Sequence, residues 1–151
     1  MQFSLSEWID APPEDVYAVA TDIEGMQAWM NNLVRIETMT EGGFREGARW
    51  REVRKMYGKE AAEQFEVRAA SPSSAFTLYV DGSKGASKRG EYVFEHNLVP
   101  ENGGTRFQMD ATMSSMGLMG RILGPLMKGA FKKAIRKDLV FMKEFIESRN
   151  G

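Results

Sequence analysis

Apolar and polar residues alternate along several segments of the chain, which is the pattern of strands with one buried face. Residues 2–10 alternate in this way, with Phe3 and Leu5 among the apolar positions, and predict the first strand. Prolines and carboxylates at residues 12–15 then favour a helix start, because proline suits a first turn and acids complement the helix dipole. We expect a short second helix around residues 26–30, before further strands begin.

Glycine, proline and serine clusters interrupt residues 33–113 at the spacing of a meander of antiparallel strands. Three of them predict hairpins, at Gly58-Lys59, at residues 71–74 and at residues 100–103. Because a hairpin fixes which residues oppose each other, these turns predict specific cross-strand pairs. The pairs are Met56–Ala61, Arg54–Glu63, Glu52–Phe65, Trp50–Val67, Ala69–Phe76, Val67–Leu78, Phe65–Val80, His96–Phe107, Phe94–Met109 and Tyr92–Ala111.

In this register the large apolar residues of all three hairpins fall on one face, which supports the predicted sheet. Residues 81–89 do not keep the same parity, so this segment requires an odd-length loop or a bulge.

The last third of the chain predicts one long helix from Leu118 to Ser148. Apolar residues recur at helical spacing from Leu126 onward, and five basic residues between positions 128 and 137 occupy the other side. Glycines and a proline weaken residues 117–125, which form either a hinge or an irregular connection. A meandering sheet followed by one long helix buries that helix across the concave face of the sheet, an arrangement that leaves room for a cavity.

The amino-acid composition indicates one globular domain and argues against a metal or cofactor site. With 151 residues, 42% of them hydrophobic and 27% charged, residues 1–151 are expected to form a single ligand-binding domain. The chain has no cysteine and one histidine, and its acidic residues lack calcium-loop or facial-triad spacing, so we expect no metal. It has no P-loop and no dinucleotide fingerprint, so we expect no cofactor.

The formal net charge of −1 gives no overall field that attracts nucleic acid or an acidic membrane. The chain lacks a signal-peptide pattern and an apolar run of about 20 residues, so we expect a cytoplasmic protein without a membrane span.

The order of one strand, two short helices, a six-strand meander and a long helix resembles the START-like, helix-grip superfamily. The polyketide cyclase/dehydrase and lipid-transport branch is the most similar. The matching features are Ile9 to Tyr17, Asp22 with Trp29, the strand after Gly47, Val67 with Pro72, Gly104-Thr105-Arg106, and the amphipathic terminal helix. This resemblance covers essentially the whole chain. It implies an α+β fold in which a seven-stranded antiparallel sheet wraps around a long C-terminal helix, and a small hydrophobic or amphipathic ligand.

The predicted inward face of the sheet is largely apolar. Its candidate ligand-binding residues are Trp50, Phe65, Phe76, Leu78, Tyr92, Phe94, Phe107, Met109 and Met113, with Leu123, Met127 and Phe131 opposite them on the helix. From the residues alone, a solid core and a cavity lining are equally consistent with this pattern. The family resemblance favours the cavity.

Glu52, Arg54 and Glu63 share the same predicted face as the apolar residues. Buried charges require partners, and the predicted Arg54–Glu63 pair supplies one. These residues form either a solvated rim near the turn or a polar end of the pocket, where Arg54 binds an oxygen of the ligand. Tyr92 either packs or donates a hydrogen bond, and His96, close to the predicted hairpin tip, is expected to be exposed.

Three functions fit these features. The first is binding or transport of a small apolar molecule between sheet and helix. The second is a cyclase or dehydratase that uses Glu52, Glu63, Arg54, Tyr92 or His96, and it predicts a carboxyl group with a shifted pKa in a closed pocket. The third is an adaptor that acts through the basic helix face without a ligand, and it predicts a filled core with an exposed apolar patch.

Overall fold

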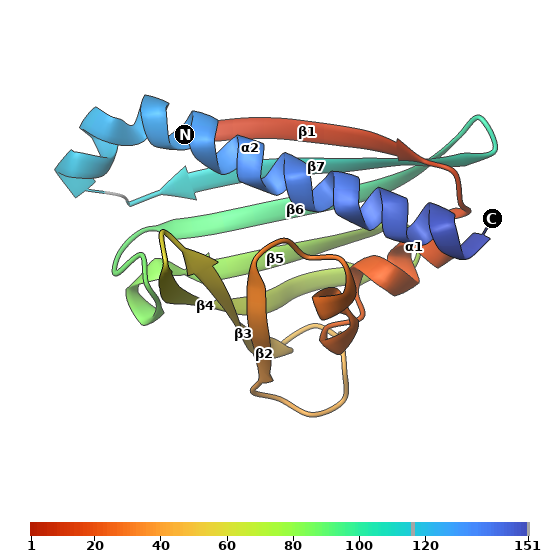
Figure 1. Ribbon diagram of the computed structural model, residues 1–151, viewed down its shortest axis with the longest axis horizontal. Coiled ribbons are helices and arrows are strands. Elements are labelled where there is room, and N and C mark those ends of the chain that lie inside the picture. The colour runs from red at the N-terminus through yellow and green to blue at the C-terminus, as the bar shows by residue number, and fades with distance from the viewer. Residues whose placement is uncertain (116, 151) are drawn as a thin grey trace.

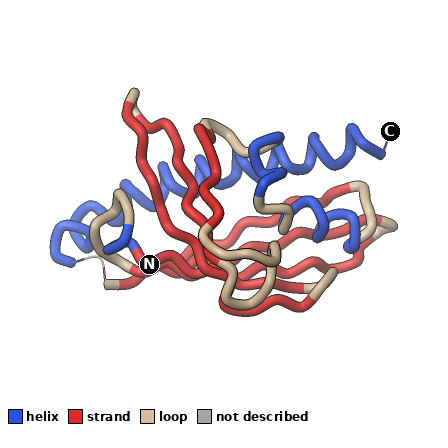
Figure 2. Tube along the Cα trace, turned by 90° about the horizontal axis from the view of Figure 1, so that it is seen from below, coloured by secondary structure: helices blue, strands red, loops and turns tan. Residues whose placement is uncertain are grey.

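The computed structural model describes residues 1–115 and 117–150 and has the α+β helix-grip architecture expected from the sequence. Seven antiparallel strands form one sheet in the order β1-β7-β6-β5-β4-β3-β2, and the long helix α2 lies across its concave side (Figures 1 and 2). The strands are β1 Gln2–Ile9, β2 Leu33–Thr38, β3 Arg49–Met56, β4 Lys59–Ser71, β5 Ala75–Asp81, β6 Glu91–Glu101 and β7 Gly104–Ser114. The helices are α1 Pro13–Ala20, η1 Glu24–Ala28, η2 Gly82–Lys84 and α2 Gly117–Asn150.

The two short helices between β1 and β2 follow the sequence signals at their starts. Pro13 occupies the first turn of α1 together with two acidic residues, as the sequence predicts. The second helix is a short 3₁₀ segment that ends at Ala28, so Trp29 and Met30 lie beyond it, in the connection to β2. This connection becomes one wall of the candidate site.

In two of the three predicted hairpins the turn lies one residue from its predicted position, which shifts the cross-strand pairing by two residues. Their turns are Tyr57-Gly58 and Asn102-Gly103, and all four residues have positive φ, between 49° and 78°. A turn with positive φ at both central residues matches the right-handed twist of the adjoining strands. The observed pairs are therefore Met56–Lys59, Arg54–Ala61, Glu52–Glu63, Trp50–Phe65, His96–Met109, Phe94–Ala111 and Tyr92–Met113.

A two-residue displacement keeps each side chain on its predicted face, so the inward face of the sheet is unchanged. In the middle hairpin, the pairs Val67–Leu78 and Phe65–Val80 are confirmed, but a bulge after Val67 places Ala70, not Ala69, opposite Phe76. Residues 82–90 form the odd-length loop that the parity of the strands requires.

The two ends of α2 differ in their surroundings. Leu139, Met142 and Ile146 are buried against the sheet and α1, and the half-buried ring of Phe131 contacts Phe3 at 6.0 Å between ring centroids. The first turns project past the sheet (Figure 1), and they are helical despite Pro125, so the alternative of an irregular connection is wrong. Among the described residues, no helix combines the length and apolarity that crossing a membrane requires.

Candidate ligand-binding site

The apolar side chains predicted to line a cavity mostly pack against each other. Trp50, Phe76, Leu78, Tyr92, Phe94, Phe107, Met109 and Met113 are buried in the core. Trp50 stacks on half-buried Phe65 with 5.6 Å between ring centroids, and Phe131 lies 6.1 Å from Tyr92 and 6.3 Å from Phe94. Leu123 and Met127 are 41% and 51% exposed on the projecting turns of α2, so they are not part of this core.

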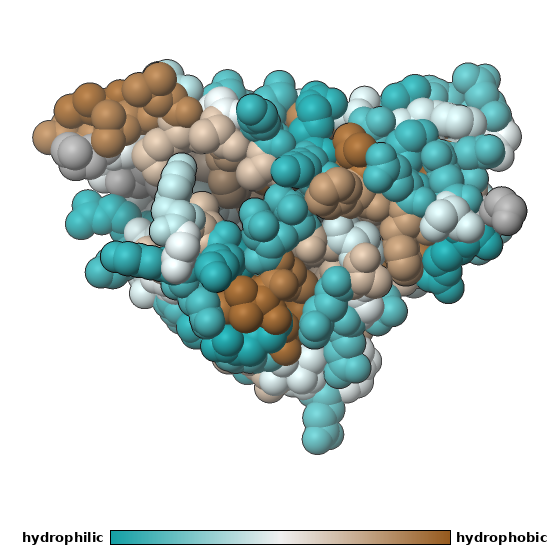
Figure 3. Space-filling model, viewed as in Figure 1, coloured by the Kyte–Doolittle hydropathy of each residue, from teal (hydrophilic) through white to brown (hydrophobic). Residues whose placement is uncertain are grey.

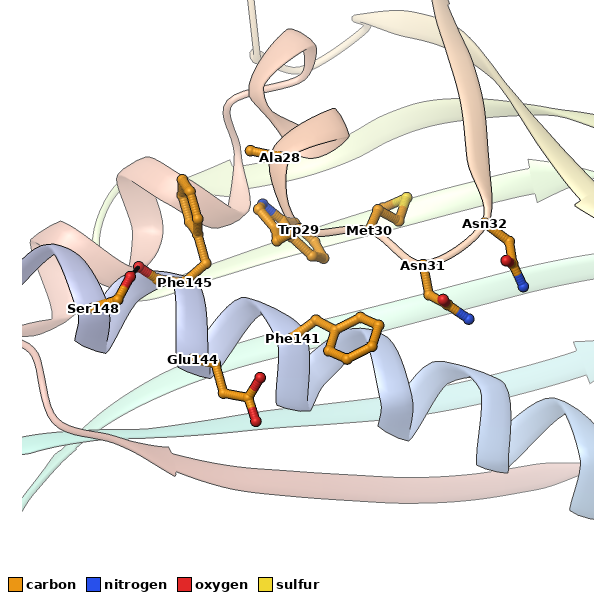
Figure 4. Close-up of a pocket in the computed structure, with 9 residues that line it drawn as sticks. All are labelled: Ala28, Trp29, Met30, Asn31, Asn32, Phe141, Glu144, Phe145 and Ser148. Carbon is orange, nitrogen blue, oxygen red and sulfur yellow. Dashed lines mark hydrogen bonds between the residues drawn. The ribbon is translucent and has the colours of Figure 1, made fainter.

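An open cleft of about 560 Å³ lies between the connection from η1 to β2 and the last turns of α2 (Figure 4). Its apolar walls are Trp29 and Met30 on one side and Phe141 and Phe145 on the other. The remaining lining residues are Ala28, Asn31, Asn32, Glu144 and Ser148. An apolar surface with a few polar groups is the usual composition of a small-molecule site.

Neither wall of this cleft is among the candidates named from the sequence. The signals that point to it are two large apolar residues just past a helix end, Trp29 and Met30, and the i, i+4 pair Phe141 and Phe145. The indole Nε1 of Trp29 is shielded from solvent and has no hydrogen-bond acceptor within the described part of the chain. A buried donor without a partner lowers stability, so this N–H belongs to the packing behind the cleft wall.

The cleft adjoins a network of charged side chains that joins α2 to the sheet. Arg54 on β3 donates from Nη1 to Asp138 Oδ2 on α2 at 2.8 Å, and from Nη2 to Glu52 Oε2 at 3.2 Å. Asp138 also accepts from the backbone N–H of Asn31, a residue of the cleft, at 3.0 Å. Trp50 Nε1 lies 3.5 Å from Glu52 Oε1. The network therefore runs from the stacked rings of the core to the wall of the cleft.

Burial is the largest single influence on the pKa values of Glu52 and Arg54 in this network. Removal from water raises the pKa of Glu52, although Arg54 and the Trp50 indole act in the opposite direction. For Arg54, burial alone lowers the pKa, but the carboxylates of Glu52 and Asp138 outweigh it, so the net pKa is raised. Arg54 is thus a fixed cation between two acidic groups.

The predicted Arg54–Glu63 ion pair is wrong, because the displaced turn moves Glu63 opposite Glu52. Glu63 instead accepts from the backbone N–H of Ser87 at 2.8 Å and from the Ser87 hydroxyl at 2.5 Å. Tyr92 donates to the same Ser87 hydroxyl at 3.1 Å. Glu63 and Tyr92 therefore both bond to Ser87, in the loop after η2, and neither bonds to Arg54.

His96 is buried, so its expected exposure near a hairpin tip is wrong. The corrected register places it opposite Met109, inside the sheet, where its ring stacks on Phe76 with 4.2 Å between centroids. Burial lowers its pKa from 6.5 to about 4, and Nδ1 lacks a hydrogen-bond partner among the described residues. A neutral, core-packed imidazole of this kind belongs to the interior and not to the cleft.

A second open cleft of about 460 Å³ lies where α2 crosses β1 and β7, and it is predominantly polar. Its lining residues are Ser4, Leu5, Ser6, Gln108, Asp110 and Arg136. The cleft beside Trp29 is therefore better suited to an apolar guest. Within the described ranges, the acidic and histidine side chains form no group of three that is placed to bind a metal ion.

A family model described as polyketide cyclase/dehydrase and lipid transport matches residues 1–147. Among solved structures, TTHA0849 from Thermus thermophilus is 21% identical over 100% of both chains, with a TM-score of 0.81. A protein of unknown function, SA2116 from Staphylococcus aureus, is 15% identical over 99% of this chain and 95% of its own, with a TM-score of 0.77.

The structure of Ara h 8.0201 is 15% identical over 98% of each chain, with a TM-score of 0.76. At such identities the likeness shows a shared fold and not a shared ligand. No curated protein sequence matches this chain significantly.

Proposed function

The chain belongs to the polyketide cyclase/dehydrase and lipid transport family, and from this premise we propose that it binds a small, neutral, largely apolar molecule in the cleft between η1–β2 and α2. The observation that carries the proposal is a cleft walled by four large apolar side chains and polar groups, with a buried charged network beside it. Burial of apolar surface, at about 25 cal/mol per Å², supplies most of the affinity. The polar lining residues Asn31, Asn32 and Ser148 supply the groups that orient the guest.

The charges beside the cleft argue for a neutral guest. Arg54 already donates to Glu52, to Asp138 and to the backbone carbonyl of Asn31, and these four hydrogen bonds use most of its five N–H donors. Two acidic groups surround this single cation, so a carboxylate or phosphate on the guest meets repulsion. Arg54 therefore holds the wall of the cleft in place, in contrast to the direct contact with the ligand that the sequence suggested.

In this proposal, the core residues that the sequence suggested as ligand contacts stabilise the protein beside the cleft and do not contact the guest. Phe65 and Trp50 stack behind Glu52, and Glu52 in turn positions Arg54. These residues do not line the cleft, but they form a rigid support beside it, because aromatic stacking and charged hydrogen bonds fix their orientations. Residues 1–151 act together as one binding domain, since the two walls of the cleft come from distant parts of the chain.

Binding is favoured over catalysis by the position of Glu52. A general base has to contact the reacting group, either directly or through one water. Glu52 is 5% exposed, and its two oxygens face the Trp50 indole and Arg54. Its raised pKa is therefore the result of burial in a structural network, an origin that such shifts commonly have.

The proposal is tested by titrating the protein with a neutral fluorescent probe such as Nile red. Phe141→Ala removes part of one wall of the cleft, and we expect the affinity to fall about thirtyfold, since burying a Phe side chain is worth roughly 2 kcal/mol. Met39→Ala serves as the control, because Met39 is 44% exposed and is not a lining residue of the cleft. Equal affinities of Phe141→Ala and the control, with both variants folded, contradict the proposal.

A further inference from the structure

The projecting turns of α2 carry an apolar surface that no other part of the described protein covers. Five exposed large hydrophobic side chains lie within residues 118–127, and we call them the apolar start of α2. They are Leu118 at 71% exposure, Ile122 at 64%, Leu123 at 41%, Leu126 at 79% and Met127 at 51%. Figure 3 shows the hydrophobic colour gathered over this end of the helix. Such a cluster marks an interaction surface.

The same end of the molecule is strongly basic. Residues 82–90 and 117–137 together contain nine of the chain's 20 Lys and Arg residues and no Asp or Glu. Three carboxylates adjoin the loop, since Glu63 accepts from Ser87 and Asp81 and Glu91 flank residues 82–90, so the excess of positive charge is greatest along α2. The two segments adjoin, because Arg89 packs so closely on Gly117 that a Cβ added there lies 2.5 Å from its Nη1 atom. The formal net charge of −1 hides this local concentration of positive charge.

Basic residues of α2 lie on the same outer side of the helix as the apolar start, a few turns further along. Leu118, Ile122 and Leu126 follow each other at intervals of four residues, on one side of the helix. Lys133 and Lys137, both exposed, lie seven and eleven residues after Leu126, and these spacings return to nearly the same angle around the axis. The outer side of α2 is therefore apolar at its start and cationic along the next turns.

We propose that this end of α2 docks on the surface of an anionic lipid bilayer. The apolar start enters the boundary between head groups and acyl chains, and the cations of α2 and of the loop at residues 82–90 contact acidic head groups. Helices that lie on membranes combine these two features, and each Lys or Arg near an anionic surface adds to the attraction. This docking does not depend on whether the cleft near Trp29 holds a guest.

Two other occupants fit the surface less well. A second copy of the chain brings two cationic ends together, so like charges oppose each other across the contact. A nucleic acid matches the charge, but it leaves the strongly exposed side chains of Leu126 and Ile122 without an apolar environment. An anionic bilayer satisfies both the charge and the apolar surface.

The test is sedimentation of the full chain with lipid vesicles. We expect binding to vesicles of phosphatidylcholine with about 30% phosphatidylglycerol, weak or no binding to phosphatidylcholine alone, and release as salt rises from about 50 to about 500 mM. Leu126→Asp places a charge at the most exposed position of the apolar start, and it is expected to lower the partition coefficient at least tenfold. Tyr57→Asp is the matched control, because Tyr57 is 99% exposed at a hairpin tip.

A second variant reports insertion independently. Leu126→Trp is expected to show a blue-shifted indole emission on adding anionic vesicles, and quenching by lipids brominated on their acyl chains. The proposal is overturned by absence of binding to anionic vesicles at low salt, or by equal partitioning of Leu126→Asp and Tyr57→Asp. It is also overturned if Leu126→Asp instead dissociates a dimer seen by analytical ultracentrifugation, or if the protein binds homopolymer RNA but not vesicles.

Discussion

Individual buried polar groups in this protein are stabilised to different extents. Thr105, which is fully buried, donates its hydroxyl to the backbone carbonyl of Ala11 at 2.8 Å. Glu52 faces an indole N–H and a guanidinium. His96 differs from both, because its Nδ1 atom has no partner in the described part of the chain and its ring is held between Phe76 and Phe107. Such a group lowers stability when it takes up a proton.

His96 is therefore expected to make the protein sensitive to mild acid. Its pKa is about 4 when folded and 6.5 when unfolded, so between these values the unfolded chain binds more protons and stability falls as the pH falls. The loss approaches about 3 kcal/mol at its limit. We expect His96→Phe to remove this component, and urea denaturation of both proteins at pH 7 and pH 5 measures it. Because the chain has one histidine, an unchanged difference between the two pH values contradicts the assignment.

Among the secondary-structure elements, the strand faces could be predicted from the sequence, whereas the turn positions could not. Alternation of apolar residues determines which side chains face inward, and a displacement by two residues leaves that result intact. The turn at Tyr57-Gly58 requires a positive φ at a tyrosine, which is unusual for a residue with a bulky side chain, so the sequence favoured Gly58-Lys59. The partner of Arg54 was missed because Asp138 lies 84 residues further along the chain.

The attachment of α2 to the sheet depends on this long-range pair as well as on apolar contacts. Arg54 bridges acidic groups on β3 and α2, while Arg35 bridges Glu37 and Glu60 at the surface of the sheet. The two arginines make similar contacts, but Arg35 is 49% exposed and Arg54 is 27% exposed. Their replacement therefore separates the effect of burial from the effect of ion pairing.

We expect Arg54→Leu to cost about 3 kcal/mol of unfolding free energy, because it leaves Glu52 and Asp138 largely buried without their cation. Arg35→Leu is expected to cost less than about 1 kcal/mol, as exposed ion pairs contribute little. Denaturant unfolding at neutral pH measures both values. Since the pKa of Glu52 is already raised, the loss in Arg54→Leu grows as the pH rises and the carboxyl ionises. Equal losses in the two variants rule out a special role for the buried network.

For the whole molecule, the two proposed surfaces lie at opposite ends of one helix. The cleft uses residues 141–148 of α2, and the membrane surface uses residues 118–127. At 1.5 Å per residue, positions 122 and 145 are about 35 Å apart along the axis. The sequence revealed the basic helix and the fold, but it did not reveal that the first turns leave the sheet, since their apolar residues look like a continuation of the core stripe.

This separation predicts that the two binding events protect different amides from hydrogen exchange. Nile red is expected to slow exchange at residues 28–32 and 141–148, where the walls of the cleft lie. Anionic vesicles are expected to slow exchange at residues 118–127 and 82–90. Leu126→Asp serves as the control for the first experiment and Phe141→Ala for the second, because each variant alters only the other surface. If one partner protects both ends of α2, or one variant abolishes both effects, then the two surfaces are not independent, and the helix acts as a single binding element along its length.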